Sequence, residues 1–239
     1  MQIAMWSGPR NLSTAMMYAF GQRADCAVVD EPFYGAYLRA TGLEHPMGDA
    51  IMAGMEPDAD RVAADCAGPV PGGKLHYYQK HMTHHMIDAF PVAWISEVTN
   101  VFLIRHPARV IASYAAKREA PVLTDLGFTQ QLNLFERVCA LGQDPVVVDA
   151  TDIRADPKGM LQALCDAVGL SFDPAMLAWP AGGNVADGIW AAHWYGAVHR
   201  STGFAGAEGP VPDVTPDSQA VFAPAMECYD AMVGRKLRA

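Results

Sequence analysis

Basic residues are scarce in this sequence. The 17 Lys and Arg residues stand against 26 Asp and Glu, which leaves a formal net charge of −9 at pH 7. A protein that binds the nucleic-acid backbone needs a basic face to displace counterions, so this balance argues against nucleic acid as a partner. Any anionic ligand must instead be held by a few local cations. The candidates are Arg10, Lys80, Arg105, Arg109 and Arg200.

Cysteine motifs and long hydrophobic runs are also missing. The five cysteines are scattered, odd in number and without C-x-x-C spacing, which is typical of reduced thiols in a cytoplasmic protein. No hydrophobic run approaches the length of a membrane span, and the N-terminus does not resemble a signal peptide. We therefore expect a soluble, cytoplasmic protein with no membrane partner, and we assign no metal or redox role to the thiols.

Apolar strand-like segments alternate with helix-like segments along the 239 residues. After a first strand that begins by Ile3, the expected strands are the start of CAVVDEPFY, which ends at Asp30-Glu31, then KLHYYQKHM, NVFLIRHP, which stops at its Pro, and DPVVVDA. The expected helices include residues 12–22, 83–90, 107–119, 128–142 and 216–236, and the amphipathic stretch PKGMLQALCDAVGL, whose helix is ended by Gly169. This alternation predicts an α/β fold, with a central, mostly parallel sheet flanked by helices on both faces. Ligands of such sheets bind beyond the carboxyl ends of the strands.

The length suits one domain over residues 1–239. Residues 41–73 are rich in Gly, Pro, Asp and Met, and we expect them to form a lid or an irregular insertion. The last helix ends in the basic stretch GRKLRA. It either closes the core or joins a second copy in a homodimer, and the sequence leaves both open.

The stretch AMWSGPRNLSTAMMYAF, residues 4–20, predicts a strand, a turn and a helix. Backbone N–H groups at such a helix start favour a phosphate or a sulfate. The ATP-type loop G-x-x-x-x-G-K-[ST] is incomplete here, because Leu12 and Ser13 stand at its Gly and Lys positions. What remains is Arg10 with the hydroxyls of Ser13 and Thr14, a set that can hold an anion without magnesium. An ordinary helix N-cap is the alternative.

Two further stretches complete a pattern that resembles a known family. In VFLIRHPARVIASY, Arg105 ends a strand and Ser113 follows on the next helix; later comes VVVDATDIRADPKGMLQALCDAVGLSFDPAML. With the loop, these resemble the cofactor signature of sulfotransferases that use 3′-phosphoadenosine 5′-phosphosulfate (PAPS). The resemblance implies a P-loop sulfotransferase-like domain of three layers, with PAPS as co-substrate and no metal.

The same resemblance implies roles for the cationic residues. Arg105 and Ser113 would bind the 3′-phosphate, a task that suits a guanidinium and a hydroxyl; an ion pair between Arg105 and a carboxylate is the alternative. Arg200, in HRSTGF, resembles the family's late basic segment, which also reaches the 3′-phosphate. The 5′-phosphosulfate would be bound by Arg10, Asn11, Leu12, Ser13 and Thr14, although Asn11-Leu12 replaces the usual Ser-Gly.

Sulfuryl transfer to a hydroxyl needs a general base. Glu31 in DEPFY and His81 in YYQKHM both resemble family positions that carry this role, with His84 as a weaker third. Adjacent residues of a strand point to opposite faces, so Lys80 and His81 are not expected to share one site, and Glu31 is preferred. The histidines at 81, 84 and 85 could also form part of a zinc site, but the sequence has no H-E-x-x-H pattern to support one.

The sequence thus predicts a PAPS-dependent sulfotransferase that acts on a hydroxyl of a small-molecule acceptor. Two alternatives stay open. One is an ATP-dependent P-loop kinase or nucleotide phosphatase, which strict magnesium dependence would favour. The other is a catalytically inactive nucleotide-binding protein of the same fold.

Overall fold

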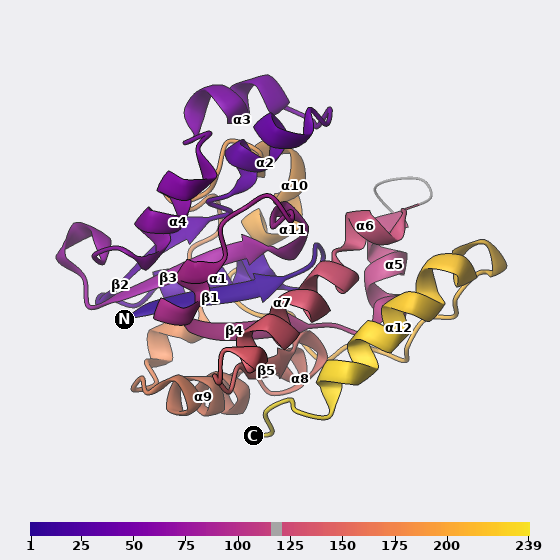
Figure 1. The fold of residues 1–239 in the computed structure, drawn as a ribbon. Helices are drawn as coiled ribbons and strands as arrows, with labels where there is room; N and C mark the ends of the chain where they lie inside the picture. The colour runs from indigo at the N-terminus through magenta and orange to yellow at the C-terminus, as the bar shows by residue number, and fades with distance from the viewer. Residues whose placement is uncertain (116–120) are drawn as a thin grey trace.

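Five parallel strands form one sheet at the centre of the computed structural model, which describes residues 1–115 and 121–239. The strand order is β2-β3-β1-β4-β5, so that β1 lies in the middle (Figure 1). The strands are β1 (Gln2–Ser7), β2 (Cys26–Asp30), β3 (His76–Met82), β4 (Thr99–Ile104) and β5 (Val146–Asp149). The predicted α/β fold with a parallel central sheet is confirmed.

Helices follow most of the strands. They are α1 (Ser13–Gly21), α2 (Tyr34–Thr41), α3 (Gly48–Gly54), α4 (Ala59–Ala67), α5 (Pro107–Ala115), α6 (Leu123–Leu126), α7 (Phe128–Ala140), α8 (Ala150–Ala155), α9 (Pro157–Val168), α10 (Ala191–Trp194), α11 (Gly196–His199) and α12 (Gln219–Val233). Within the described ranges, no helix is both long and apolar enough to cross a membrane.

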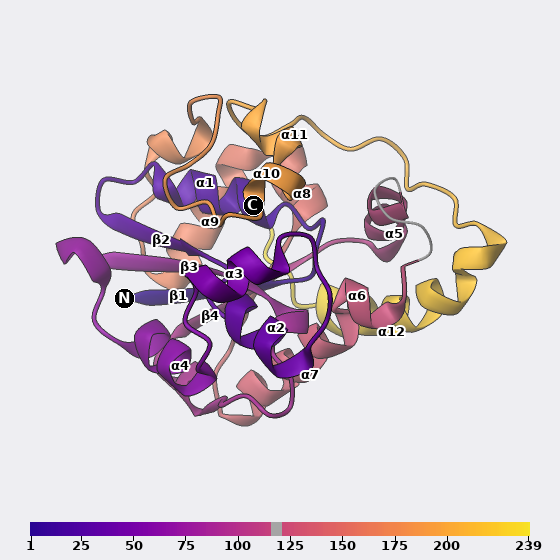
Figure 2. The same cartoon turned by 90° about the horizontal axis from the view of Figure 1, so that it is seen from above.

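The alternation of side chains along β1 divides the core into two layers. Ile3 and Met5 face α1 and α9, whereas Ala4 and Trp6 face the layer that contains α2, α4 and α7. Seen from above, the two groups of helices lie on opposite sides of the sheet (Figure 2). A strand that is apolar on both faces is expected in such a parallel sheet.

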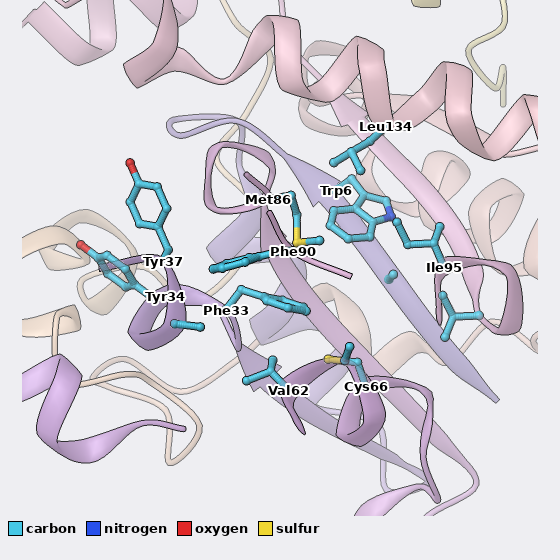
Figure 3. Close-up of a cluster of buried hydrophobic side chains, with 14 of the residues drawn as sticks. Trp6, Phe33, Tyr34, Tyr37, Val62, Cys66, Met86, Phe90, Ile95 and Leu134 are labelled. Atoms are coloured by element: carbon cyan, nitrogen blue, oxygen red, sulfur yellow. The ribbon is translucent and has the colours of Figure 1, made fainter. Parts of the chain in front are cut away.

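The second layer is rich in aromatic side chains (Figure 3). Trp6 lies there among Phe33, Phe90 and Ile95, and all four side chains are at most 8% exposed. Trp6 Nε1 donates a hydrogen bond of 2.8 Å to Asn100 Oδ1, which satisfies its one polar atom. This packing fixes the end of β1 and therefore the loop that follows it.

Sequence signals place several boundaries correctly. The start of α9 has Asp156, whose side chain accepts from Gly159 N at 3.0 Å, followed by Pro157 at the first helical position. The helix ends at Gly169, which has a φ of 78° that suits glycine. Residues 41–73 contain α3 and α4, joined by irregular stretches.

The helix predicted over residues 83–90 is wrong, because only a 3₁₀ turn forms at Thr83–His85. Tertiary contacts override helix propensity there: the Thr83 hydroxyl donates to the Gly127 carbonyl at 3.0 Å, and His85 stacks against Tyr34 and Tyr37. The helix predicted over 107–119 is α5 as far as Ala115, and residues 116–119 lie outside the described ranges.

Candidate active site

A cavity of about 360 Å³ lies beyond the carboxyl ends of four strands. It is lined by the loop after β1 (residues 9–15), by Glu31 after β2, by His84 and His85 after β3, and by Arg105 after β4. Ser113 of α5 and residues of α10 and α11 complete the wall. This is the edge at which parallel α/β sheets bind their ligands.

Three residues that line this cavity have an unusual backbone. Arg10, Leu12 and Glu31 have φ values of 64°, 70° and 47°, in the left-handed region that non-glycine residues rarely adopt. Each such residue costs about 1–3 kcal/mol. Leu12 is also the N-cap of α1, and its side chain cannot accept a hydrogen bond from the first turn. The helix therefore presents its uncapped, positive end to the cavity.

The loop is joined to β4 and α5 by its arginine. Arg10 Nε donates to Ser113 Oγ at 2.9 Å, and Arg105 Nη1 donates to the Arg10 carbonyl oxygen at 2.5 Å. Burial, and then the charge of Arg105, lower the pKa of Arg10. The three residues that the resemblance assigned to the two ends of the nucleotide thus form one contiguous group, in which Ser113 contacts Arg10 directly.

Asn11, Ser13 and Thr14 also line the cavity. Asn11 is buried, and its Nδ2 donates to the Leu103 carbonyl at 3.3 Å, which ties the loop to the end of β4. The close approach of Gly8 to the Leu126 backbone carbonyl leaves no room for a Cβ at position 8. The shape of the loop is therefore set by its contacts with two neighbouring segments.

Arg105 also forms an ion pair with Glu208, whose side chain is 3% exposed. The ion pair between Arg105 and a carboxylate, which the sequence analysis gave as the alternative to phosphate binding, is therefore present in the structure. Arg109 and Arg154 contact the same carboxylate. Sequence reasoning missed Glu208, because it lies in a stretch with no periodic pattern.

A buried ionic network around Lys80 also contributes to the cavity lining. Lys80 Nζ lies 2.7 Å from Asp30 Oδ1, 2.5 Å from Glu31 Oε1 and 2.6 Å from Tyr195 Oη. Burial by itself would lower the pKa of Lys80, but the two carboxylates outweigh it and raise that pKa. The pKa of Glu31 is raised, chiefly because burial disfavours the carboxylate. Sequence reasoning did not assign Tyr195 to this network.

One histidine lies near Glu31, and a second histidine contacts the first. His85 Nε2 lies 4.0 Å from Glu31 Oε2, and the ring of His84 contacts that of His85 at a centroid distance of 4.4 Å. Burial lowers the pKa of His84 to about 3 and that of His85 well below its usual value, so both rings are neutral at pH 7. Among the described residues, their buried Nδ1 atoms have no hydrogen-bond partner.

Two of the residues singled out from the sequence lie away from the cavity lining. His81 is 2% exposed, stacks on Trp6 at 4.4 Å and lies 3.1 Å from Gln79 Oε1 through its Nε2. Because a strand alternates its faces, Lys80 points to the ionic network while His81 points into the aromatic layer. The structure therefore gives no support to His81 as a base. Arg200 is exposed and does not line the cavity either.

A metal site receives no support from the described residues, where no group of three His, Cys, Asp or Glu side chains could hold an ion. His84 and His85 lie side by side, but His81 points away from them into the core.

The family model described as "Sulfotransferase domain" matches residues 1–236. The chain belongs to the sulfotransferase domain family. The resemblance drawn from the three sequence motifs is thereby confirmed. Membership of this family supports sulfuryl transfer as the general activity of the chain.

Solved sulfotransferase structures share the fold. A sulfotransferase domain from the curacin biosynthetic pathway is 14% identical, with a TM-score of 0.55 and coverage of 99% of this chain and 98% of that one. A sulfotransferase from Alicyclobacillus acidocaldarius is 13% identical, with a TM-score of 0.55 and coverage of 99% and 96%. At such low identity the likeness shows the fold alone.

Curated relatives are longer proteins. Branched-chain-amino-acid aminotransferase-like proteins 1 and 2 of Arabidopsis thaliana are 38% and 37% identical to this sulfotransferase domain over 202 residues. The match covers 84% of this chain but only 36% of either relative. The aminotransferase in their names therefore describes proteins nearly three times as long as the matched part.

Proposed function

We propose that the protein transfers the sulfuryl group of PAPS to a hydroxyl of a small-molecule acceptor. The observation that carries this proposal is the contiguous group of Arg10, Ser113 and Arg105, which lines the same cavity as Glu31. Residues suited to bind a phosphate and a candidate base thus line one cavity.

The residues around Arg105 and Arg10 fit the nucleotide. Arg105 Nε is buried and, among the described residues, has no hydrogen-bond partner, so it can donate to a ligand oxygen. Arg105 and Ser113 would hold the 3′-phosphate. Arg10 and the uncapped start of α1 would hold the 5′ end and favour the negative charge that develops there. When bound, the nucleotide supplies the activated sulfuryl group.

The residues around Glu31 fit a hydroxyl acceptor. Glu31 Oε1 is engaged by Lys80, which leaves Oε2 on the side of His85 to accept the proton of the attacking hydroxyl. The neutral rings of His84 and His85, with Tyr34, Trp190 and Trp194, make an aromatic wall. Such a wall favours an acceptor with an apolar or aromatic body.

Transfer from ATP is the second candidate, and the loop disfavours it. The lysine of the ATP-type loop is missing, and Arg10 is bound to Ser113 of α5, a residue that ATP-type loops do not require.

All five cysteines are unpaired, as in a reducing compartment, which supports a cytoplasmic location.

The test compares two donors on one panel of acceptors. The protein is incubated with ³⁵S-labelled PAPS, or with γ-³²P-labelled ATP, and a panel of phenols and alkyl alcohols, with EDTA or with magnesium. We expect labelled sulfate esters in the presence of EDTA and none from the Glu31→Gln variant. Magnesium-dependent phosphate esters formed from ATP would contradict the proposal.

A further inference from the structure

Three arginines converge on a single buried carboxylate beside the cavity. Glu208 pairs with Arg105, with Arg109 Nε at 3.2 Å and with Arg154 Nη1 at 2.8 Å. Thr151 Oγ1 donates to Glu208 Oε2 at 3.1 Å. These four residues come from the ends of β4 and β5 and the helices after them, so the sheet itself positions them.

The cluster has more positive charge and more donors than one carboxylate can satisfy. Three guanidinium charges face one negative charge, and in the described part of the chain the Nε atoms of Arg105 and Arg109 are buried without a hydrogen bond of good geometry. A phosphate monoester carries nearly two negative charges and three terminal oxygens, and guanidinium groups bind it in bidentate fashion. The cluster therefore matches a phosphate better than it matches Glu208.

The segment that carries Glu208 is anchored at its start by Phe204, which packs against Trp179. Residues 204–215 form neither helix nor strand. Arg154 Nε donates to the Gly206 carbonyl at 3.0 Å, and Arg109 Nη2 donates to the Gly209 carbonyl at 2.6 Å. The same arginines that contact the carboxylate thus also hold the backbone on both sides of it. An anion that took over these arginines would therefore also release the backbone around Glu208.

We propose that Glu208 stands in for a ligand phosphate, and that Arg109, Arg154 and Thr151 extend the phosphate site of Arg105. The ligand class is a nucleotide with a 3′-phosphate monoester, so this inference rests on the proposed function. The phosphate binds only when Glu208 leaves the arginines, and Glu208 therefore lowers the affinity of the site by competition within the chain.

The first experiment removes the charge of the competitor. Adenosine 3′,5′-bisphosphate and 5′-AMP are titrated calorimetrically into the wild type, Glu208→Gln and Asp213→Asn, the last being an exposed acid of the same segment. We expect Glu208→Gln to bind the bisphosphate about ten times more tightly, with AMP and the Asp213→Asn variant unchanged. An unchanged or weaker affinity for the bisphosphate, or an equal gain for AMP, would overturn the inference.

A second variant keeps the test decisive if Glu208→Gln folds poorly. Arg154→Ala leaves Glu208 in place but removes one proposed phosphate ligand. We expect it to weaken binding of the bisphosphate several-fold and to leave AMP unchanged. Equal affinities of the wild type and Arg154→Ala for the bisphosphate would count against the extended site.

A third readout separates this inference from the proposed function. Inorganic phosphate is added to the wild type, Glu208→Gln and the Glu208→Gln/Arg154→Ala double variant, and Tm is measured. We expect the largest increase in Tm for Glu208→Gln. If phosphate raises the Tm of Glu208→Gln most but the bisphosphate does not bind, the proposed nucleotide is wrong and the anion site around Glu208 stands. If the bisphosphate binds in a way that depends on Arg105 but not on Glu208, the proposed nucleotide stands and the inference about Glu208 is wrong.

Discussion

Lys80 Nζ lies 2.5 Å from Glu31 Oε1, and both side chains are almost fully buried. Lys80 comes from β3, whereas Glu31 follows β2, so the pair joins the ends of two adjacent strands. Asp30 shares the same ammonium group at 2.7 Å. The pair fixes one oxygen of Glu31 and leaves the other toward His85 and the cavity, which is the orientation that a general base needs.

The role of Glu31 can be separated from its contact with Lys80. Asp30→Asn and Glu31→Gln each remove one carboxylate charge from Lys80, but only Glu31 lines the cavity. We expect Glu31→Gln to lower kcat by about 10²- to 10⁴-fold, the usual contribution of a general base. Binding of adenosine 3′,5′-bisphosphate should stay within about twofold, because Glu31 is not among the residues proposed to hold the nucleotide.

Asp30→Asn is the matched control, and its kcat should fall by less than about tenfold. Equal losses in the two variants would mean that Glu31 acts only through the ionic network.

The pKa of Glu31 is raised, and a base works in its ionised form. Activity of the wild type should therefore rise with pH, with a midpoint above the ordinary Glu value of about 4.3.

Removal of Lys80 should destabilise the fold. Lys80→Met would leave Asp30 and Glu31 as two buried carboxylates without their cation. Breaking a buried ion pair in this way costs about 3–5 kcal/mol in the free energy of unfolding, measured by urea denaturation at pH 7. Tyr195→Phe removes only a hydroxyl from the same network and should cost less. If Lys80→Met lowers the free energy of unfolding by less than about 1 kcal/mol, Lys80 is not the cation that stabilises the buried carboxylates of Asp30 and Glu31.

Buried neutral histidines make the protein sensitive to acid. Burial lowers the pKa of His81 and of His84 to about 3, and that of His85 well below its usual value. The histidines of the unfolded chain take up protons near pH 6.5, whereas those of the folded chain do not. The contribution of these histidines to the free energy of unfolding is therefore complete above pH 6.5 and is lost as the pH falls below it. Each histidine contributes up to about 1.4 kcal/mol per pH unit.

Chemical denaturation at pH 7, 6 and 5 measures this slope. We expect the free energy of unfolding to fall by up to about 4 kcal/mol between pH 6 and pH 5. His81→Phe should reduce that slope by about a third, whatever it does to the stability at pH 7. A stability that is flat from pH 7 to pH 5 would show that these histidines titrate normally.

Local patterns in the sequence predicted many of the residues that line the cavity. Strand alternation correctly separated Lys80 from His81, which point to opposite faces of β3. The turn after β1 and the end of β4 were predicted from residues that are adjacent in the chain. Parallel pairing then brings such strand ends to one edge, so Glu31 and Arg105 reach the same cavity.

Contacts between distant irregular segments could not be predicted in this way. Glu208 and Arg105 are 103 residues apart, and Tyr195 and Lys80 are 115 apart. Neither Glu208 nor Tyr195 belongs to a periodic pattern that fixes the direction of its side chain. The turn at Thr83–His85 failed as a predicted helix for the same reason, since its conformation depends on Gly127 and on the rings of Tyr34 and Tyr37.

The most direct test of the account is the preference of the protein for a 3′-phosphate. Adenosine 3′,5′-bisphosphate and ADP are titrated calorimetrically, in EDTA, into the wild type, Arg105→Ala and the exposed control Arg200→Ala. We expect the wild type and Arg200→Ala to prefer the bisphosphate, and Arg105→Ala to lose about 10- to 100-fold in affinity for it alone, as the loss of charged hydrogen bonds implies. Preference for ADP, or equal affinity of Arg105→Ala and the wild type for the bisphosphate, would contradict the account.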